Sequence, residues 1–422
     1  MKCTDRRVIL IEGSKVAHGA TGHNAGQIVA DFEREFTDLV REYGLEKAAD
    51  AEKAVRGAWV LLEELYQEAS LSTPMSSFMG YNGYCSIEHL IQEIKANILR
   101  KEAGLQTYSI YIASEVAENN PLLKEFKNFY ETVPVENILS LLETGDTCYV
   151  AAVAVKKGCM NSAMLTEELT GYLLATHKER FSLYEHSSVR TVDLNKDDVA
   201  LSVTTNLKNG TPEQSYKISA NKIILCTNGF ERIHLKNNVG DDIDVKFHQM
   251  VSGDIGYMAA YVEDMKDPPT ALGYYDQEDC DNVYGTPSFF YLTKRPYELE
   301  KNEIHNLVCV GGPEKIIPET ENYDRQEAFS VDMGDKIDRF VKKTIKNRKE
   351  ENLQYKFQWH GVMCYTPSRM RIIGPEPKNQ ALLYNLGCNG VGILASIYGG
   401  WKISKLLLGE QFPESIFDPK ME

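Results

Sequence analysis

A carboxylate and a small-residue segment near the N-terminus could bind a dinucleotide. Glu12 follows the apolar residues 8–11, and residues 19–27 are Gly-Ala-Thr-Gly-His-Asn-Ala-Gly-Gln. A carboxylate at the tip of a strand in a dinucleotide fold accepts hydrogen bonds from ribose hydroxyls, and small residues let backbone amides approach a ligand. A plain turn after a strand fits the same pattern. The candidate residues are Glu12, Ala20, Thr21, Gly22, His23, Asn24, Ala25 and Gly26.

A second glycine-rich segment, residues 387–392, separates an apolar stretch at 382–385 from a helical pattern that begins at residue 393. A helix N-terminus approached by glycines offers unpaired N–H groups and the positive end of the helix dipole, which suits a phosphate or an anionic reduced flavin. A tight strand-to-helix connection is the alternative. The candidates are Gly387, Asn389, Gly390, Val391 and Gly392. A third segment, residues 359–375, contains a Thr-Pro turn before a short apolar strand.

The elements that must position these segments alternate between strands and helices. Residues 8–11 are an uninterrupted apolar run, which predicts a strand buried on both faces of a parallel sheet, and 222–226, apolar after Lys222, predict a second buried strand. Tyr-Asn-Gly-Tyr at 81–84 predicts a turn. Helices are predicted at 32–43, 55–69, 87–100, 164–174 and 325–349, and strands at 150–155, 183–194, 199–207, 216–218 and within 245–312.

Composition narrows the class of protein. With 46 basic and 61 acidic side chains among 422 residues, the formal net charge is −15, so we expect no binding to the phosphate backbone of a nucleic acid. The nine cysteines are scattered without a C-x-x-C pair, which predicts neither a disulfide framework nor a metal site and favours a reduced, cytoplasmic setting. The apolar stretch 391–408 is interrupted by lysines, so it predicts a buried helix and no transmembrane segment.

In order along the chain, these segments resemble the D-amino-acid-oxidase-like family of FAD-dependent oxidoreductases. That family includes D-amino-acid dehydrogenases, glycine and sarcosine oxidases and γ-glutamylputrescine oxidase. Residues 8–12 resemble its second strand with the ribose carboxylate, 19–27 its flavin loop, and 366–375 with 387–392 its C-terminal flavin signature. The segment 158–165 resembles the start of its mid-chain helix. Val189 stands where the family contacts adenine, and Thr227, Asn228 and Gly229 where its chain passes the cofactor.

The resemblance implies an α/β plus α+β fold, in which a Rossmann-like FAD-binding domain is interleaved with an antiparallel-sheet substrate domain. The implied FAD-binding parts are residues 1–45, 150–240 and 355–422, and the substrate and helical parts are 46–149 and 241–354. The family begins with a strand and G-x-G-x-x-G roughly twenty residues before the ribose carboxylate. Here eleven residues precede Glu12, so the first βα unit is expected to be missing. The favoured explanation is a truncated sequence, and the alternative is a flavin-free descendant.

The resemblance also implies the chemistry, which is oxidation of a C–N bond by hydride transfer to flavin N5, followed by hydrolysis of the imine. Sarcosine-oxidase relatives bond the flavin to a cysteine. Gly361 stands at that position here and Cys364 lies three residues later, so we expect non-covalent FAD. Tyr291, Arg295 and Arg369 are the candidate catalytic residues, because an arginine can clamp a substrate carboxylate.

The expected partner is a small-molecule amine or amino acid, with oxygen or a respiratory carrier as the electron acceptor. Two other readings of the sequence stay open. One is an N-demethylating, sarcosine-type oxidase. The other is a non-catalytic remnant that acts as a binding protein.

Overall fold

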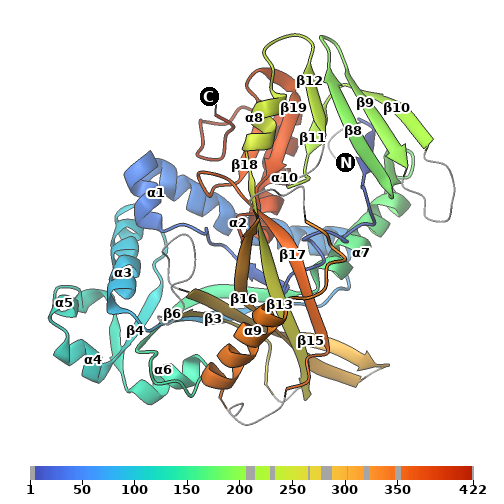
Figure 1. The fold of residues 1–422 in the computed structure, drawn as a ribbon. Coiled ribbons are helices and arrows are strands. Elements are labelled where there is room, and N and C mark those ends of the chain that lie inside the picture. The colour runs from blue at the N-terminus through green and yellow to red at the C-terminus, as the bar shows by residue number, and fades with distance from the viewer. Residues whose placement is uncertain are drawn as a thin grey trace.

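The computed structural model describes residues 5–205, 214–228, 233–264, 267–276, 288–301, 303–317, 323–346 and 353–420. Within these residues the chain forms two parts, a large sheet below and a group of smaller sheets above (Figure 1). The mixed α/β architecture agrees with the predicted fold class.

The lower part is a ten-stranded, mostly antiparallel sheet. In spatial order its strands are β17 (Phe357–Tyr365), β13 (Ser252–Asp264), β16 (Glu303–Ile317), β15 (Ser288–Glu300), β14 (Thr270–Asp276), β3 (Met75–Tyr84), β6 (Ala151–Met160), β4 (Ser109–Ala113) and β5 (Glu131–Val133), and β2 (Gln27–Val29) also pairs with β6.

The predicted turn at 81–84 is wrong, because these residues end β3 and pair on both sides. Tyr81 and Gly83 lie opposite Ala154 and Ala152 of β6, and the same stretch pairs with β14. Asn-Gly favours turns locally, but here the glycine satisfies a packing requirement: a Cβ on Gly83 would lie 2.6 Å from Leu142 Cδ1. Tertiary pairing therefore overrides the local preference.

The upper part contains the strands expected for nucleotide binding, in three separate sheets. β1 (Val8–Ile11) pairs with β7 (Phe181–Tyr184) in parallel, and β11 (Ile223–Leu225) pairs with β19 (Asn379–Leu386), whose other neighbour is β18 (Ile372–Glu376). The third sheet has the order β10 (Gln214–Ala220), β9 (Val199–Thr205), β8 (Ser187–Leu194) and β12 (His234–Asn237). Strands near residues 10, 225 and 385 therefore lie in one part of the molecule.

The predicted burial of the strands at 8–11 and 222–226 is wrong. Val8, Ile9 and Leu10 are 40%, 45% and 41% exposed, and Ile224 of β11 is 40% exposed. Within the described residues β1 pairs only with β7 and β11 only with β19, so each strand has one edge without a neighbour. The missing first strand itself stays a prediction.

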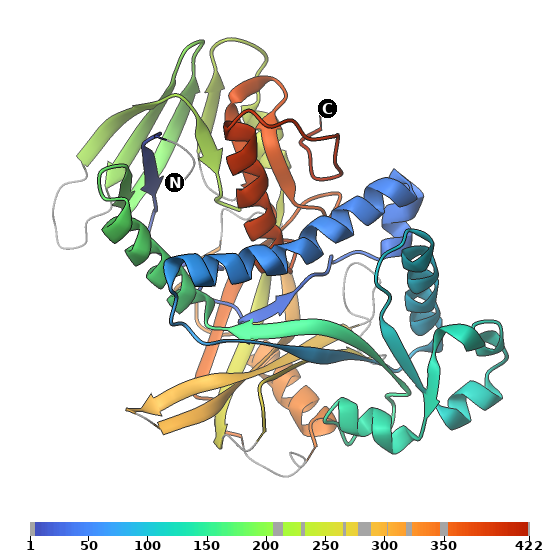
Figure 2. The same cartoon turned by 180° about the vertical axis from the view of Figure 1, so that it is seen from behind.

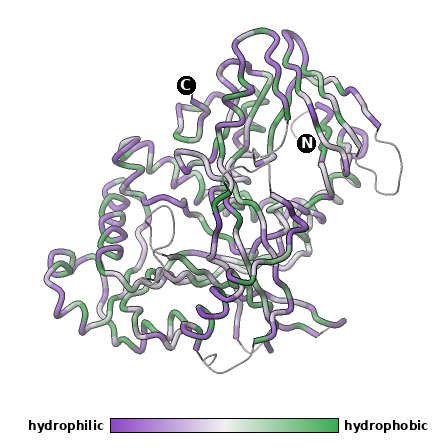
Figure 3. Tube along the Cα trace, viewed as in Figure 1, coloured by the Kyte–Doolittle hydropathy of each residue, from purple (hydrophilic) through white to green (hydrophobic). Residues whose placement is uncertain are grey.

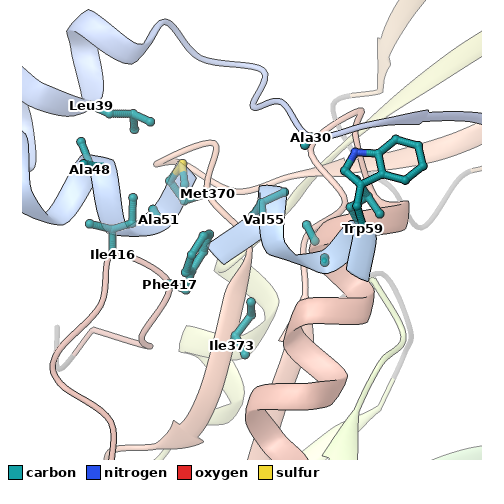
Figure 4. Close-up of a cluster of buried hydrophobic side chains, with 14 of the residues drawn as sticks. Ala30, Leu39, Ala48, Ala51, Val55, Trp59, Met370, Ile373, Ile416 and Phe417 are labelled. Atoms are coloured by element: carbon teal, nitrogen blue, oxygen red, sulfur yellow. The ribbon is translucent and has the colours of Figure 1, made fainter. Parts of the chain in front are cut away.

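The long helix α2 (Leu45–Ala69) crosses the molecule between the two parts and packs against α10 (Ile393–Leu407), as Figure 2 shows. Its buried face is rich in alanine, so neighbouring segments approach it closely. In Figure 4, Ala51 and Val55 of α2 lie beside Phe417 and Ile373 in the core of the upper part.

The remaining helices lie around these layers. They are α1 (Phe36–Tyr43), α3 (Ile87–Glu102), α4 (Ser114–Asn119), α5 (Pro121–Lys124), α6 (Val135–Leu141), α7 (Ser162–Thr176), α8 (Asp244–Gln249) and α9 (Val331–Thr344). Polar and apolar residues are interspersed along the chain in both parts (Figure 3). Among the helices described, none is long and apolar enough to cross a membrane.

The predicted domain boundaries stay a proposal, with two observations that bear on them. β6 and β17 fall in ranges assigned to the FAD-binding domain, yet both pair into the large sheet. Most of α2 falls in a range assigned to the substrate domain, yet it shares a core with β18, β19 and α10 of the upper part. The chain therefore passes between the two parts at more places than the predicted domain boundaries imply.

Candidate active site

A cavity of about 2500 Å³ lies between the two parts. This volume is more than twice that of a large small-molecule pocket, so a cofactor and a substrate can share the space. Of the residues predicted from sequence, those that line it are Glu12, Ala20, Thr21, His23, Asn24, Ala25, Val189, Thr227, Asn228, Tyr291, Gly361, Arg369, Gly390, Val391 and Gly392. The predicted residues that do not line it are Gly22, Gly26, Arg295, Gly387 and Asn389. Gly229 lies outside the described residues.

Glu12 stands at the end of β1 and faces the cavity. Its Oε1 accepts a hydrogen bond of 2.8 Å from the Ser14 N–H, and its backbone C=O accepts the Ser187 N–H, which places Val189 of β8 nearby. This is the arrangement needed for a carboxylate to meet ribose hydroxyls at the edge of a nucleotide site. Thr227, which follows β11, also lines the cavity. Its Oγ1 is buried and has no hydrogen-bond partner in the described part of the chain.

Asn24 shapes the small-residue loop between β1 and β2. Its Nδ2 donates to the carbonyl oxygens of Ala20 (2.9 Å) and Thr21 (2.7 Å), and its Oδ1 accepts the Gly26 N–H (2.7 Å). Gly26 has φ +74°, and a Cβ there would lie 1.9 Å from the Met160 carbonyl oxygen. The side chain of Asn24 and the absence of one at Gly26 therefore position the loop, and its backbone faces the cavity.

The glycine segment before α10 is held from behind by polar side chains. Asn389 Oδ1 accepts the Thr366 N–H at 2.8 Å and its Nδ2 donates to the Gly387 carbonyl oxygen at 3.1 Å. The buried Arg371 donates to the same carbonyl at 3.3 Å. Gly387 and Asn389 thus position the segment, while Gly390 (φ +72°) and the residues that follow it face the cavity. The N-terminus of α10 is directed to a site where an anion would be stabilised.

The sheet side of the cavity has an acidic group that the sequence did not single out. Gly361 of β17, Gly256 of β13 and Glu314 of β16 lie in one row across three adjacent strands, and all three line the cavity. The Glu314 side chain is exposed, so its carboxylate stands open to the cavity. Its environment raises the pKa of Glu314 to about 8, first through desolvation and then through the charges of Glu33 and Asp254.

Glu33 lies on the opposite side, against the glycine segment. A Cβ on Gly390 would lie 2.6 Å from its Oε1, so only glycine leaves room for this carboxylate. Burial raises the pKa of Glu33 to about 7, with a further contribution from Asp31. Arg369, which also lines the cavity, is a counter-charge to both Glu33 and Glu314. No sequence motif near Glu33 or Glu314 predicts a functional site, because only the fold brings the two side chains to the same cavity.

The three predicted catalytic residues occupy different places. Tyr291 lines the cavity and its hydroxyl donates to Met258 Sδ at 3.6 Å. Arg369 lines the cavity with φ +54°, and its guanidinium lies 5.5 Å from the Tyr365 ring centroid. The Arg295 side chain packs behind the loop, where its Cδ would lie 3.4 Å from a Cβ on Gly26. Their catalytic roles stay predictions, and Arg369 is the better-placed arginine.

Together, the interleaved fold and the glycine-lined cavity fit a nucleotide cofactor. Residues 3–406 match the sequence profile of the DAO family, described as FAD dependent oxidoreductase. The chain therefore belongs to this family of FAD-dependent oxidoreductases, whose cofactor is FAD, and the resemblance found in the sequence is confirmed.

Solved structures of the same fold support this assignment. Glycine oxidase from Geobacillus kaustophilus matches with a TM-score of 0.65 at 13% identity, covering 99% of this chain and 92% of that one. L-proline dehydrogenase from P. horikoshii matches with a TM-score of 0.65 at 12% identity, covering 96% and 94%. L-α-glycerophosphate oxidase from Mycoplasma pneumoniae, with FAD bound, has a TM-score of 0.60 at 13% identity, covering 98% and 92%. A search of curated protein sequences found no match.

Proposed function

We propose that this chain oxidises a C–N bond of a small amine or amino acid. The observation that supports the proposal best is the carboxylate of Glu314, which lies beside Gly256 on the sheet side of the cavity. The substrate nitrogen is a cation at neutral pH, and Glu314, once it has lost its proton, attracts that cation. Glu33 and Asp254 add negative charge around the same space.

Glu314 is also suited to accept a proton from the substrate. When bound, FAD supplies a hydride acceptor for the carbon next to nitrogen, and that carbon gives up hydride readily only if the nitrogen is neutral. Desolvation and the neighbouring carboxylates raise the pKa of Glu314 to about 8. Its affinity for a proton is therefore closer to that of an amine than an ordinary carboxylate's is. Glu314 would bind the ammonium group, take its proton and leave the neutral amine in place.

The residues around the cavity fit an FAD molecule held without a covalent bond. Glu12 would hold the ribose, the 20–25 backbone and Thr227 would contact the middle of the cofactor, and the N-terminus of α10 would stabilise negative charge on its ring system. Gly361 has no thiol to bond the ring, and a Cβ at this position would lie 3.7 Å from His23.

Arg369 decides between an amine and an amino acid as substrate. It lies on the cavity wall near Glu33 and Glu314, so a substrate with an ammonium group and a carboxylate could contact both charges. An amine without a carboxylate would need only the glutamate. The variant Arg369→Leu is therefore expected to raise KM for amino acids far more than for amines.

The test of the proposed function is anaerobic reduction of the FAD-loaded protein. Primary amines, amino acids, N-methyl amino acids, α-hydroxy acids and glycerol phosphate are mixed with it in turn, and flavin absorbance is followed. Bleaching by amines or amino acids, with ammonia as product, supports the proposal. Formaldehyde from N-methyl substrates would establish the demethylating alternative. Bleaching by hydroxy compounds alone would overturn the proposal, and protein that binds no FAD would favour a non-catalytic remnant.

Glu314→Gln sharpens this test. In the unmodified enzyme kcat/KM should rise with pH through about 8, because Glu314 must lose its proton before it can accept one. The amide cannot accept a proton, so this rise should disappear and kcat/KM at pH 8 should fall by about 10²- to 10⁴-fold. An unchanged pH profile would exclude Glu314 as the acceptor.

A further inference from the structure

Two cysteines meet where the large sheet touches the glycine segment. Cys364 is in β17 and Cys388 is in the segment before α10, and their sulfur atoms are 3.7 Å apart. The Cys388 N–H donates to Cys364 Sγ at 3.0 Å, and the Cys364 N–H donates to Cys388 Sγ at 3.4 Å. The Asn389 N–H also donates to the Cys364 carbonyl oxygen at 2.8 Å. A disulfide needs about 2.05 Å between the sulfurs, so the pair is one short movement from bonding.

The two thiols differ in what can reach them. Cys388 lines the cavity, whereas Cys364 is fully buried behind it, with its Sγ 2.8 Å from Asn228 Oδ1. A hydrogen bond from Cys364 and the nearby charge of Arg371 lower the pKa of Cys388 to about 6. Burial raises the pKa of Cys364. The accessible sulfur is therefore the thiolate, and the buried sulfur is the thiol.

We propose that Cys388 and Cys364 are a redox-active pair, in which Cys388 reacts with a hydroperoxide in the cavity and Cys364 then closes a disulfide. The Cys388 thiolate attacks one peroxide oxygen, the O–O bond breaks, and a sulfenic acid and hydroxide form. The Cys364 thiol attacks that sulfur, the S–S bond forms, and water leaves with the transferred oxygen. Two thiols lose two electrons and two protons, and hydrogen peroxide becomes two molecules of water.

This site is separate from the proposed oxidation of amines. Hydrogen peroxide is the oxidant, whether or not this chain produces it, and the step uses side chains that take no part in binding the substrate ammonium. The disulfide would remove a thiolate from the cavity wall and tie β17 to the segment that begins α10.

Other cysteines of the chain can be compared with the Cys364–Cys388 pair. Cys226 also lines the cavity and is exposed, but desolvation raises the pKa of its thiol, so less of it is thiolate and it should react more slowly than Cys388. Cys85 Sγ and Cys148 Sγ lie 2.7 Å apart at the start of β6, away from the cavity, and their proximity raises the pKa of Cys148. An oxidant could link that pair too, so the two links must be mapped separately.

Peptide mapping tests the proposal directly. The full-length protein is reduced, treated with hydrogen peroxide at pH 7, alkylated and digested with trypsin without reduction. Cys364 falls in peptide 357–369, Cys388 in 379–402 and Cys226 in 223–232, whereas Cys85 and Cys148 fall in 57–95 and 128–156. A species joining 357–369 to 379–402, two hydrogens lighter than their sum, is expected, with Cys226 alkylated. Cys388 present as sulfinic acid beside alkylated Cys364, or both thiols unchanged, would overturn the proposal.

Two variants and a rate measurement separate the roles of the sulfurs. In Cys364→Ser, the Cys388 sulfenic acid should persist and be trapped by dimedone, whereas Cys226→Ser should form the link as the unmodified protein does. The rate of iodoacetamide alkylation at Cys388 should rise around pH 6. This rate is measured in the unmodified protein, so it tests the thiolate even if Cys364→Ser fails to fold. Alkylation of Cys388 that rises no earlier than that of Cys226 would contradict the assignment.

Discussion

The two parts of the molecule differ in how completely their strands are paired. In the large sheet, β13 and β16 each pair on both edges, and their inward side chains belong to buried clusters. In the upper part, β1 and β11 each pair on one edge, and their apolar side chains face the cavity. Burial of apolar surface is the main stabilising contribution to a fold, so the large sheet should be stable by itself and the cavity strands should depend on what fills the cavity.

The largest expected effect is in the large sheet. Tyr274 of β14 is fully buried, its ring meets Phe340 and Tyr149 edge-on, and its hydroxyl donates to the Leu142 carbonyl oxygen at 2.7 Å. Tyr274→Ala should reduce the free energy of unfolding by about 3–5 kcal/mol in urea titrations. Tyr216→Ala, at a 49% exposed position of β10 in the upper part, should change it by about 0.5 kcal/mol or less. Similar losses at both sites would remove the contrast between the two parts.

Binding of FAD should reduce the difference between the parts. A ligand that binds only the folded state adds about 2.7 kcal/mol at a concentration of about 100 times Kd. Hydrogen exchange of the β1 and β11 amides should slow when FAD is added, because these strands line the cavity, whereas exchange in β14 and β4, which do not line it, should change little. Equal slowing in all four strands, or none in β1 and β11, would show that the cavity strands do not depend on the cofactor.

A pair of adjacent glycines in α10 tests the packing of the upper part. A Cβ on Gly399 would lie 2.2 Å from Asn385 Oδ1 of β19, whereas a Cβ on Gly400 would meet nothing within 4 Å. Gly399→Ala should therefore cost about 1–3 kcal/mol of stability, because the helix must move away from the sheet. Gly400→Ala should add about 0.8–1 kcal/mol from helix propensity alone. Thermal unfolding of the two variants compares them, and a stable Gly399→Ala would mean that Asn385 can turn aside without cost.

Most of the residues predicted for the cofactor line the cavity, and the sequence could single them out because their signals are local. Glu12 follows an apolar run directly, and the glycines at 387–392 lie next to the helix that they begin, so neighbouring residues were enough to place them. The burial of residues 8–11 could not be predicted, because it depends on which strands lie beside β1. An uninterrupted apolar run indicates a strand, but the strands beside it decide whether water reaches its side chains.

The sheet side of the cavity was harder to predict, because it depends on strand register. Glu314 faces Gly256 across β16 and β13, and Gly361 extends the row, yet these residues are far apart in sequence. In the sequence Cys364 and Cys388 are two of nine scattered cysteines, and only the fold places their sulfur atoms 3.7 Å apart. A shift of one residue in either strand would turn Glu314 away from the cavity, and no local pattern sets that register.

The smallest expected effect concerns the two carboxylates that face each other across the boundary between the parts. In the folded protein the pKa of Glu33 rises from 4.5 to about 7 and that of Glu314 from 4.5 to about 8. Above pH 4.5 and below the raised pKa values, the folded state binds more protons than the unfolded state. The free energy of unfolding should therefore fall as pH rises from about 5 to about 8.

The double variant Glu33→Gln and Glu314→Gln should show a shallower decline in urea midpoints across this pH range, since amides do not titrate. Glu102→Gln, at an exposed position at the end of α3, is the matched control and should leave the slope unchanged. Burial lowers the pKa of Lys157 to about 7, which opposes the decline above that pH, but all three proteins share this contribution and it cancels in the comparison. An equal slope in the double variant would mean that water filling the cavity solvates both carboxylates. The two parts would then be independent in their electrostatics as well as in their strand pairing.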